Sequence, residues 1–406
     1  MKTLALNLLV GLARRVLAKY QPKIIGITGS VGKTTTKEAI YTALRGSFRV
    51  ARSLKNANTE WGIAATVIHP DFELSQTPDG KAHITPGQLL QLIWYGLIGQ
   101  VNYPEVLVLE LAADRPGDVR FFNTFLQYDI AVITNIGQVH LEFYKDQAEL
   151  TAEKLSIAGG LKAGGLLVLN GDNELMDEFI HTTALRRVTF GWDETNQCSI
   201  HLRDVGTDGL RYEINTPRES VDLMLGFGRQ LAAAAATAIA VGQELGVSAT
   251  QLSQRLTGFT SPAGRFEIWQ LRRGITLVDD AYNANPDSMQ SAITSLQDIA
   301  SVGGSQRRRV AVLGGMRELG AAQTSAHREV GQFLRDKVDL LVAIGPDGKL
   351  MADASGLPDA QVVRAEGPEA MDFSTLLRDN DAVLVKASRY FMLDKVAEKI
   401  KQRVGR

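Results

Sequence analysis

Short apolar runs alternate with helical patterns along much of the chain. The first run, residues 23–28 (KIIGIT), is rich in β-branched residues and leads into a glycine-rich turn, which indicates a buried strand that feeds a loop. A helical pattern follows at 34–45. Further apolar runs that predict strands lie at 106–111, 130–134, 166–169 and 187–190. Because strands that alternate with helices are typical of βαβ units, we predict a mostly parallel sheet.

The alternation restarts in the last third of the chain. Helices are predicted at 228–245 and, with Ser248 as N-cap, at 248–258, before the sequence SPAG at 261–264 breaks the pattern. Strands are then predicted at 275–279, 309–313, 339–344 and 382–386, and helices at 286–300, 323–336 and 390–403. We therefore predict an α/β protein of three parts: an N-terminal helix (1–20), a central domain (21–262) and a smaller C-terminal domain (263–406).

Two apolar segments stand outside this alternation. Residues 1–20 have the pattern of a short amphipathic helix, since the apolar run from Leu4 to Ala13 is shorter than the roughly 20 residues of a membrane span. A second apolar helix is predicted at 87–101, after a polar loop. The two helices can bury each other's faces. Alternatively, the pair walls a substrate cleft or rests weakly on a membrane surface, where anionic lipid would face Arg14, Arg15 and Lys19.

Charge and cysteine content narrow the classes of function. The chain has 406 residues, with 44 Lys and Arg against 45 Asp and Glu. This balance gives no support for broad electrostatic binding to nucleic acid, so any phosphate site must be local. The single cysteine, Cys198, excludes an intramolecular disulfide and a cysteine-rich metal site. A reducing compartment fits, and we expect a cytoplasmic monomer.

The turn after the first strand has the composition of a phosphate-binding loop. Its sequence is Gly29-Ser30-Val31-Gly32-Lys33-Thr34-Thr35-Thr36. Glycines allow backbone N–H groups to wrap a phosphate, and the N-terminus of the following helix adds positive potential. Lys33 can reach the β- and γ-phosphates of ATP, and the Thr34 hydroxyl can ligate Mg²⁺. The strict motif asks for a glycine at position 27, where this chain has Ile27.

A series of further motifs, in the same order along the chain, resembles the Mur ligase family. They are the loop variant T-G-S-x-G-K-T-T, then Asn58–Gly62, Leu109–Asp118, Ile133–Glu142, Gly264–Glu267, Asp279–Met289, Leu313–Gly320, His327 and Val385–Arg389. The stretch Asp279–Met289 (DDAYNANPDSM) is the most specific and points to the MurF branch. The resemblance covers about residues 23–400.

This resemblance implies a fold and an activity. The fold is a central phosphate-loop ATPase domain with a Rossmann-like C-terminal domain. The activity is ATP-dependent amide-bond formation through an acyl phosphate, which joins D-Ala-D-Ala to a muramyl-peptide carboxylate in peptidoglycan synthesis. MurF enzymes carry a UDP-sugar domain before the loop, whereas the loop here begins at Thr28, so we expect that domain to be lacking. The alternatives are folylpolyglutamate-synthase-like or cyanophycin-like ligation, or a nucleotide-binding regulator without catalysis.

The resemblance also implies residue roles. Lys33, His140, Lys154 and Arg265 would be catalytic, and Mg²⁺ would be held by Thr34, Glu110, His140 and a carbamylated Lys154. ATP would contact Gly29, Ser30, Val31, Gly32, Lys33, Thr34, Thr35, Asp279, Asn283 and Asn285. Substrate would contact Asn58, Lys386, Ser388 and Arg389. The chain departs from the family at Ser156, which replaces a glutamate, at Ala387, which replaces a glycine, and at 226–231, which lacks a His-Asn/Gln pair.

Several of these residues also have a structural explanation. Glu110 could be a strand-end carboxylate in solvent, His140 a satisfied structural histidine and Lys154 an ordinary lysine of a helix surface. The Asn283 and Asn285 turn could simply cap the following helix, and the lysine–serine–arginine segment at 386–389 could be a basic turn.

Overall fold

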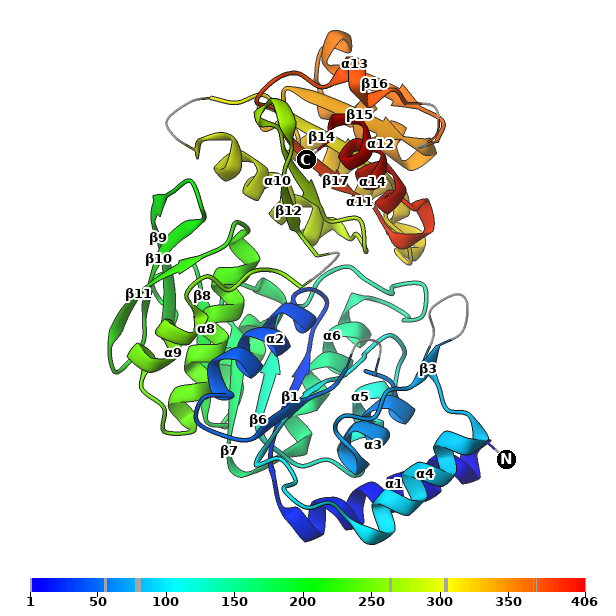
Figure 1. The fold of residues 1–406 in the computed structure, drawn as a ribbon, viewed down its shortest axis with the longest axis vertical. Coiled ribbons are helices and arrows are strands. Elements are labelled where there is room, and N and C mark those ends of the chain that lie inside the picture. The colour runs from blue at the N-terminus through cyan, green and yellow to red at the C-terminus, as the bar shows by residue number, and fades with distance from the viewer. Residues whose placement is uncertain are drawn as a thin grey trace.

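The protein is built on two sheets, one in each of two stacked α/β domains (Figure 1). The computed structural model describes residues 2–54, 57–76, 82–262, 265–302, 306–367, 369 and 371–405, without the side chains of Lys2, Ala82 and Ser374. Ala263 and Gly264, part of the predicted SPAG break and of one motif, lie outside the described residues, as does part of the predicted polar loop, 77–81.

The first sheet has nine strands. In spatial order they are β11 (Ser220–Leu225), β10 (Leu210–Asn215), β9 (Cys198–Val205), β8 (Arg187–Gly191), β7 (Leu161–Asn170), β6 (Tyr128–Ile133), β1 (Lys23–Thr28), β5 (Val106–Glu110) and β2 (Val50–Arg52). The seven strands from β9 to β2 pair in parallel, whereas β10 and β11 add an antiparallel edge. A separate antiparallel pair is formed by β3 (Ser75–Gln76) and β4 (Ala82–His83).

Helices cover both faces of this sheet. One face packs against α2 (Lys33–Leu44), α8 (Arg229–Glu244) and α9 (Ala249–Leu256). The opposite face packs against α1 (Lys2–Tyr20), α3 (Glu60–Ile68), α4 (Pro86–Ile98) and α5 (Asp118–Asn123). The domain also contains α6 (Gln147–Leu155) and α7 (Asp177–Thr182). Burial on both faces explains why β1 and β5 are continuous apolar runs.

The second sheet has six strands, all parallel except the first. In spatial order they are β12 (Glu267–Gln270), β13 (Thr276–Asp279), β17 (Ala382–Lys386), β14 (Arg309–Leu313), β15 (Leu340–Ile344) and β16 (Val362–Ala365). The helices of this domain are α10 (Pro286–Ala300), α11 (Gln323–Phe333), α12 (Gly345–Ser355), α13 (Phe373–Leu376) and α14 (Asp394–Val404). This architecture confirms the predicted fold class: two α/β domains with mostly parallel sheets.

Strand register determines which residues meet at the carboxyl edges of the sheets. In the first sheet Ile27 is paired with Glu110 and Thr28 with Ile133, so the phosphate loop, Glu110 and the segment after β6 emerge side by side. In the second sheet Asp279 is paired with Val385, which brings the turn after β13 next to Lys386. Ligands of open α/β sheets bind at such edges.

Candidate active site

The phosphate loop lies between β1 and α2, as the sequence predicted. Gly29 has φ +143°, and a Cβ there would come within 2.1 Å of the Thr134 hydroxyl. Gly32 has φ +86° and begins α2 without any side-chain cap. Only glycine adopts these conformations easily, and the uncapped N–H groups of α2 are left available for an anion. The Ser30 hydroxyl accepts a hydrogen bond of 2.9 Å from Gly137 N, which braces the loop from β6.

Lys33 folds back over this loop. Its Nζ donates to the Gly29 carbonyl oxygen at 2.5 Å, so the ammonium lies where a phosphate held by the loop would meet it. Burial lowers the pKa of Lys33, while the carboxylates of Asp114 and Glu110 oppose that shift. An amine held out of water interacts more strongly with a phosphate than a solvated one, because screening is weaker.

Glu110 and Thr34 form the pair that would hold a metal ion. The Thr34 hydroxyl lies 3.1 Å from Glu110 Oε1, and the Ser53 hydroxyl accepts from Glu110 N at 3.0 Å. Lys37 is buried and its Nζ lies 3.2 Å from the other carboxylate oxygen. The Glu110 carboxylate is therefore paired and oriented, which explains how it is tolerated at 7% exposure.

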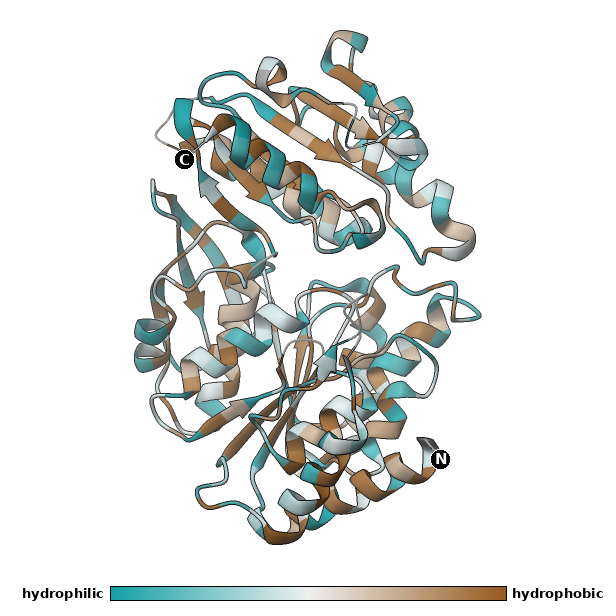
Figure 2. Ribbon diagram, turned by 45° about the vertical axis from the view of Figure 1, so that its right-hand side comes forward, coloured by the Kyte–Doolittle hydropathy of each residue, from teal (hydrophilic) through white to brown (hydrophobic). Residues whose placement is uncertain are grey.

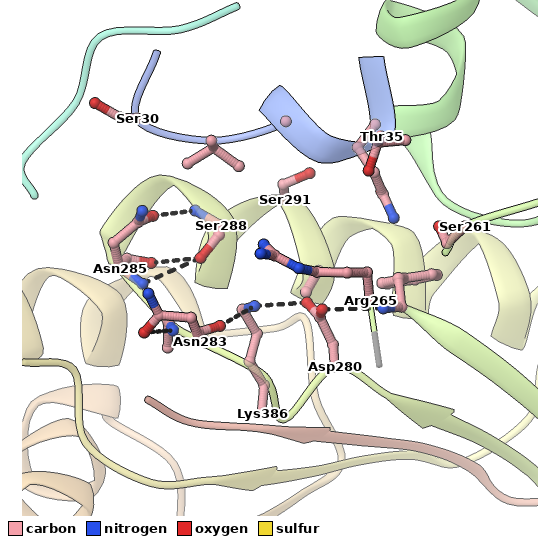
Figure 3. Close-up of a pocket in the computed structure, with 16 residues that line it drawn as sticks. Ser30, Thr35, Ser261, Arg265, Asp280, Asn283, Asn285, Ser288, Ser291 and Lys386 are labelled. Carbon is pink, nitrogen blue, oxygen red and sulfur yellow. Dashed lines mark hydrogen bonds and ion pairs between the residues drawn. The ribbon is translucent and has the colours of Figure 1, made fainter. Parts of the chain in front are cut away.

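The phosphate loop faces the second domain across an open cavity whose empty space, open solvent included, is about 650 Å³ (Figure 3). The central domain contributes Ser30, Val31, Gly32, Thr35 and Gln230. The other wall consists of residues from the C-terminal domain and the connection to it: Ser261, Arg265, Phe266, Asp280, Asn283, Ala284, Asn285, Ser288, Ser291, Ala292 and Lys386. Two sequence-distant motifs, the phosphate loop and the loop after β13, thus line a single cavity between the domains.

Arg265 extends into this cavity and also lines a second one. Its guanidinium lies 4.1 Å from the centre of the Tyr282 ring, a cation–π contact that holds it in place. The second cavity, of about 920 Å³, is lined by Thr34, Lys37, Glu38, Arg52, Ser53, Leu54, Asn58, Glu110, Pro262, Arg265 and Tyr282. Arg265 therefore lies between the loop that would bind phosphates and the residues that would hold a metal.

Lys386 and Asp280 form a buried ion pair at the base of the first cavity. Lys386 Nζ lies 2.5 Å from Asp280 Oδ2 and donates to the Asn283 carbonyl at 3.0 Å (Figure 3). Asp280 Oδ1 accepts from Phe266 N at 3.0 Å. Lys386 thereby fixes the turn that carries Asn283. Asn283 itself is exposed at the cavity rim, whereas Asn285 caps α10 through Ser288 N at 2.8 Å.

Other predicted contacts lie outside the first cavity. Asp279 is on the opposite face of β13, where its carboxylate pairs with Lys401 of α14 at 3.1 Å, so the adjacent Asp280 takes the cavity position. Asn58 lines the second cavity. Ser388 is 3% exposed, and its hydroxyl has no hydrogen-bond partner among the described residues. Arg389 is exposed.

Lys154 is buried at the end of α6. It is 1% exposed, and its Nζ donates to the Ala113 carbonyl oxygen at 3.3 Å. Burial, assisted by repulsion from Lys33, lowers the pKa of Lys154 to about 7. A large fraction of the amine is therefore uncharged at neutral pH, which is the form that reacts with carbon dioxide. Its position is not that of an ordinary lysine on a helix surface.

His140 connects the two domains. It has φ +55°, and its Nε2 lies 3.2 Å from Asp114 Oδ1 of the central domain. Its Nδ1 lies 2.5 Å from Glu318 Oε2 of the second domain. Because both ring nitrogens face carboxylates, ligation of a metal through His140 requires one of these contacts to open.

The donor atoms around Glu110 fit Mg²⁺. Magnesium in nucleotide sites is usually held by one or two carboxylates and completed by phosphates and water. Thr34 and Glu110 supply one hydroxyl and one carboxylate next to the phosphate loop. Within the described ranges no group of three or more His, Cys, Asp or Glu side chains could hold a metal ion.

Sequence reasoning missed several residues of this site. Lys37 belongs to the helix after the loop, and its spacing of four residues from Lys33 places both on one side of α2. Asp114 and Glu318 lie within the motifs that resemble the Mur ligase family, but no function was predicted for either residue. Gln230 occupies the segment where a His-Asn/Gln pair was expected, and it lines the first cavity. Only the Lys37 spacing was a signal readable from the chain alone.

Two protein-family models match this chain, one for each of its two domains. Residues 27–242 match the family model of the Mur ligase middle domain. Residues 264–389 match that of the Mur ligase glutamate ligase domain. The first match ends shortly before α9, and the second begins close to β12.

Curated relatives are similar over nearly the whole chain. A UDP-N-acetylmuramoyl-tripeptide–D-alanyl-D-alanine ligase of Synechocystis is 30% identical over 395 residues, which cover 94% of this chain and 75% of the relative. The Bacillus subtilis protein of the same name is 26% identical, with 97% and 79% covered. Among solved structures, the MurF ligase of Thermotoga maritima in complex with ADP superposes with a TM-score of 0.80 at 25% identity, covering 98% of this chain and 84% of that one.

Proposed function

This chain belongs to the Mur ligase family of ATP-dependent amide-bond ligases, and within that family we propose that it joins a D-Ala-D-Ala-like amine to a muramyl-peptide-like carboxylate. The proposal rests on one observation above all. The loop Asp280–Asn285, whose sequence favours the MurF branch, lines the same cavity as the phosphate loop. The names of the similar ligases from Synechocystis and Bacillus subtilis support the same substrate pair.

ATP would bind in the first cavity with its phosphates on the loop. Backbone N–H groups of Gly29 to Thr35 and the N-terminus of α2 would hold the β- and γ-phosphates. Lys33 would contact the γ-phosphate from within the loop, and Arg265 from the opposite domain. The similar MurF ligase of Thermotoga maritima was solved in complex with ADP, which supports nucleotide binding by this chain. Asn283, exposed at the rim, is available to the nucleoside, while Asn285 is committed to capping α10.

The reaction would proceed in two transfers. A carboxylate oxygen of the first substrate attacks the γ-phosphorus, the bond to the β-phosphate oxygen breaks, and ADP leaves with the acyl phosphate formed. The amine then attacks the acyl carbon, phosphate leaves from the tetrahedral intermediate, and the amine loses a proton. Negative charge develops on the transferred phosphoryl group between Lys33 and Arg265, and fixed cations at that position lower the barrier.

Mg²⁺ would be held by Thr34 and Glu110, and would neutralise charge on the β- and γ-phosphates when bound. A second ion near the acyl phosphate would need His140 and a carbamylated Lys154, whose anionic oxygens suit Mg²⁺. The substrate carboxylate would lie toward the second cavity, near Asn58 and Arg265. Lys386 supports this arrangement by holding the Asp280–Asn283 turn in place, which makes its role one of positioning.

The test is phosphate release measured with purified protein, ATP, Mg²⁺ and both substrates. We expect release that requires a muramyl-tripeptide carboxylate and D-Ala-D-Ala together. Folate plus glutamate and an aspartate polymer plus arginine serve as competing pairs. Turnover with one of those pairs would retain the ligase and overturn the substrate assignment. ATP binding without release under any pair would overturn the proposed catalysis itself.

A further inference from the structure

Seven large apolar side chains of α1, of α4 and of the segment after α4 are exposed at the base of the central domain. Most of both helices carries the colour of hydrophobic residues (Figure 2). We call the seven side chains the basal patch, and its members are Leu4, Leu8, Leu90, Trp94, Leu97, Ile98 and Val101. Trp94 is 64% exposed and Val101 91% exposed. The patch lies at the end of the molecule opposite the C-terminal domain (Figure 1).

The two helices form this surface as one rigid unit. They run side by side in the same direction, since a Cβ on Gly96 would lie 3.1 Å from Leu12 Cβ, and the Tyr20 hydroxyl donates to the Gln100 carbonyl at 2.8 Å. Their inner faces are buried, with Leu9 and Leu92 fully excluded from solvent. The prediction that the helices pack together is therefore confirmed. This packing involves only the inner faces of the two helices. It does not explain why their outer faces, which form the basal patch, are also apolar.

The charged residues of α1 and α4 are all basic. Neither α1 nor α4 contains an acidic residue, although the whole chain carries a net charge of −1. The second half of α1 carries the exposed Arg15 and Lys19, and Arg15 reaches the Leu97 carbonyl beside the patch. The adjacent Arg14 instead donates to the Thr124 carbonyl at 2.8 Å. An apolar strip with an exposed tryptophan and a cationic border is complementary to an anionic lipid surface.

We propose that the basal patch attaches the protein to the surface of an anionic membrane. Within the described residues no helix is long and apolar enough to cross a bilayer, so attachment through α1 and α4 would be interfacial. A second copy of the chain complements this surface less well. Two such faces would bring Arg15 and Lys19 of both copies into one interface without an acidic residue from either helix to neutralise them.

The attachment positions the active site. With α1 and α4 on the lipid, the C-terminal domain would lie at the end of the molecule away from the membrane (Figure 1). Because only a few cations contribute, binding is weak and falls as salt screens the charges. This proposal is independent of the substrate assignment, since it concerns a surface that the catalytic cavities do not include.

Vesicle flotation of the full chain tests the proposal. We compare vesicles of phosphatidylcholine alone with vesicles that contain about 30% phosphatidylglycerol. Binding is expected only to the anionic vesicles at low salt, with loss at about 0.5 M NaCl. Fluorescence of Trp94 should shift to shorter wavelength on binding, because it is the exposed one of the four tryptophans.

Variants with matched controls separate lipid binding from other uses of the patch. Trp94→Ser with Leu97→Ser should abolish flotation, and Arg15→Gln or Lys19→Gln should each weaken it about five-fold. The controls Leu175→Ser and Lys349→Gln alter an exposed leucine and an exposed lysine elsewhere and should bind as wild type does. The proposal is overturned if wild type does not float, or if the Trp94 and Leu97 variant floats normally. It is also overturned if wild type is a dimer that this variant dissociates.

Discussion

Lys154 occupies a position that is costly for a charged amine. Its amine is almost completely buried against one carbonyl oxygen, and its pKa falls to about 7 from 10.5. That difference corresponds to roughly 5 kcal/mol as an upper bound on the cost of keeping the proton there at low pH. A lysine buried in this way without a carboxylate in direct contact is poorly suited to folding, and it is well suited to carbamylation.

Replacing this lysine by methionine should therefore stabilise the protein and inactivate it. In buffer depleted of carbon dioxide, we expect Lys154→Met to raise the free energy of unfolding near pH 7 by about 1–3 kcal/mol. The unfolded chain keeps the lysine proton up to a pKa of 10.5, whereas the folded chain releases it near 7. Wild type consequently gains stability relative to the variant as pH rises from 7 to 10. Denaturant unfolding across this range measures the difference.

The same experiment distinguishes carbamylation from a purely structural role. Bicarbonate should increase the turnover of wild type prepared without carbon dioxide and leave Lys154→Met inactive. Lys349→Met, at an exposed site, is the control and should change neither stability nor turnover. Full activity of the Lys154 variant would remove this residue from the mechanism.

Substitution of Lys33 should have a different effect on stability, because this residue is half-buried and its amine donates a hydrogen bond to the Gly29 carbonyl oxygen of the loop. Lys33→Ala should reduce turnover by about 10²-fold or more through loss of a cation at the transferred phosphoryl group. The fold should persist, with a change in the free energy of unfolding of less than about 1 kcal/mol. Steady-state kinetics and thermal unfolding check the two expectations. Turnover close to wild type would mean that the loop does not bind the reacting phosphate.

The sequence alone does not predict which of two neighbouring aspartates faces the cavity. Asp279 and Asp280 are chemically equivalent in the sequence, and only the strand register decides that Asp280 faces the cavity while Asp279 meets Lys401. Successive side chains of a strand point to opposite faces, so an error of one residue exchanges the two roles. Contacts between the domains, such as His140 with Glu318, depend on domain packing, which no local pattern contains.

Among the elements, parallel strands were easier to predict than the antiparallel edge. Buried strands such as β1, β6 and β14 are continuous apolar runs, and their predicted positions agree with the structure to within two residues. Strands β10 and β11 were not predicted, although their burial alternates along the chain, and the parallel strands β2, β9 and β16 were also not predicted. Half-buried strands carry charged residues on the open face, so they lack the apolar density by which the others were identified.

Helix α1 is an integral part of the central domain and not a loose extension. Leu9 is fully buried in the core beneath the first sheet, whereas the adjacent Leu8 is 46% exposed. Leu9→Ala should lower the free energy of unfolding by about 2–4 kcal/mol, as expected for a core leucine. Leu8→Ala, the matched control, should change it by less than about 0.5 kcal/mol. Chemical denaturation provides both values. Equal, small effects would show that α1 does not belong to the cooperative unit.

The substitutions Leu8→Ala and Leu9→Ala also test whether α1 contributes to the substrate site, because the helix lies away from both cavities. Neither Leu8 nor Leu9 lines either cavity. The Michaelis constants for ATP and for soluble substrates should therefore stay unchanged in both variants under conditions where the protein is folded. A rise in the constant for the carboxylate substrate alone would indicate instead that α1 helps to build the substrate site.

For the whole molecule, the relative position of the two domains determines whether the cavity exists. Polar contacts across the interface include Arg229 with Asp298, Asn135 with Asp287 at 2.7 Å, and His140 with Glu318. Arg229 binds Asp298 through two hydrogen bonds of 2.8 and 3.0 Å and stacks over Trp192. Arg229 stands in the segment where a His-Asn/Gln pair was expected, so this chain uses the position to join its domains.

Breaking that pair should loosen the closed arrangement and weaken nucleotide binding. In Asp298→Asn, the guanidinium of Arg229 loses its charged partner at a site where the carboxylate is only 9% exposed. If the open arrangement becomes populated, the apparent dissociation constant for ATP rises in inverse proportion to the closed fraction, which we expect to be about 3- to 10-fold. Calorimetry measures the affinity, and small-angle scattering measures the accompanying increase in radius of gyration.

The matched control is a pair of the same kind within one domain. Arg186 and Glu244 also form a bidentate ion pair, but both residues belong to the central domain. Glu244→Gln should leave the ATP affinity and the radius of gyration unchanged, since it removes a charge without crossing the interface. If the two variants weaken ATP binding equally, the effect of Asp298→Asn arises from general destabilisation. If neither does, the domains are held together by the apolar contacts between α8 and α10, and the polar contacts only set their orientation.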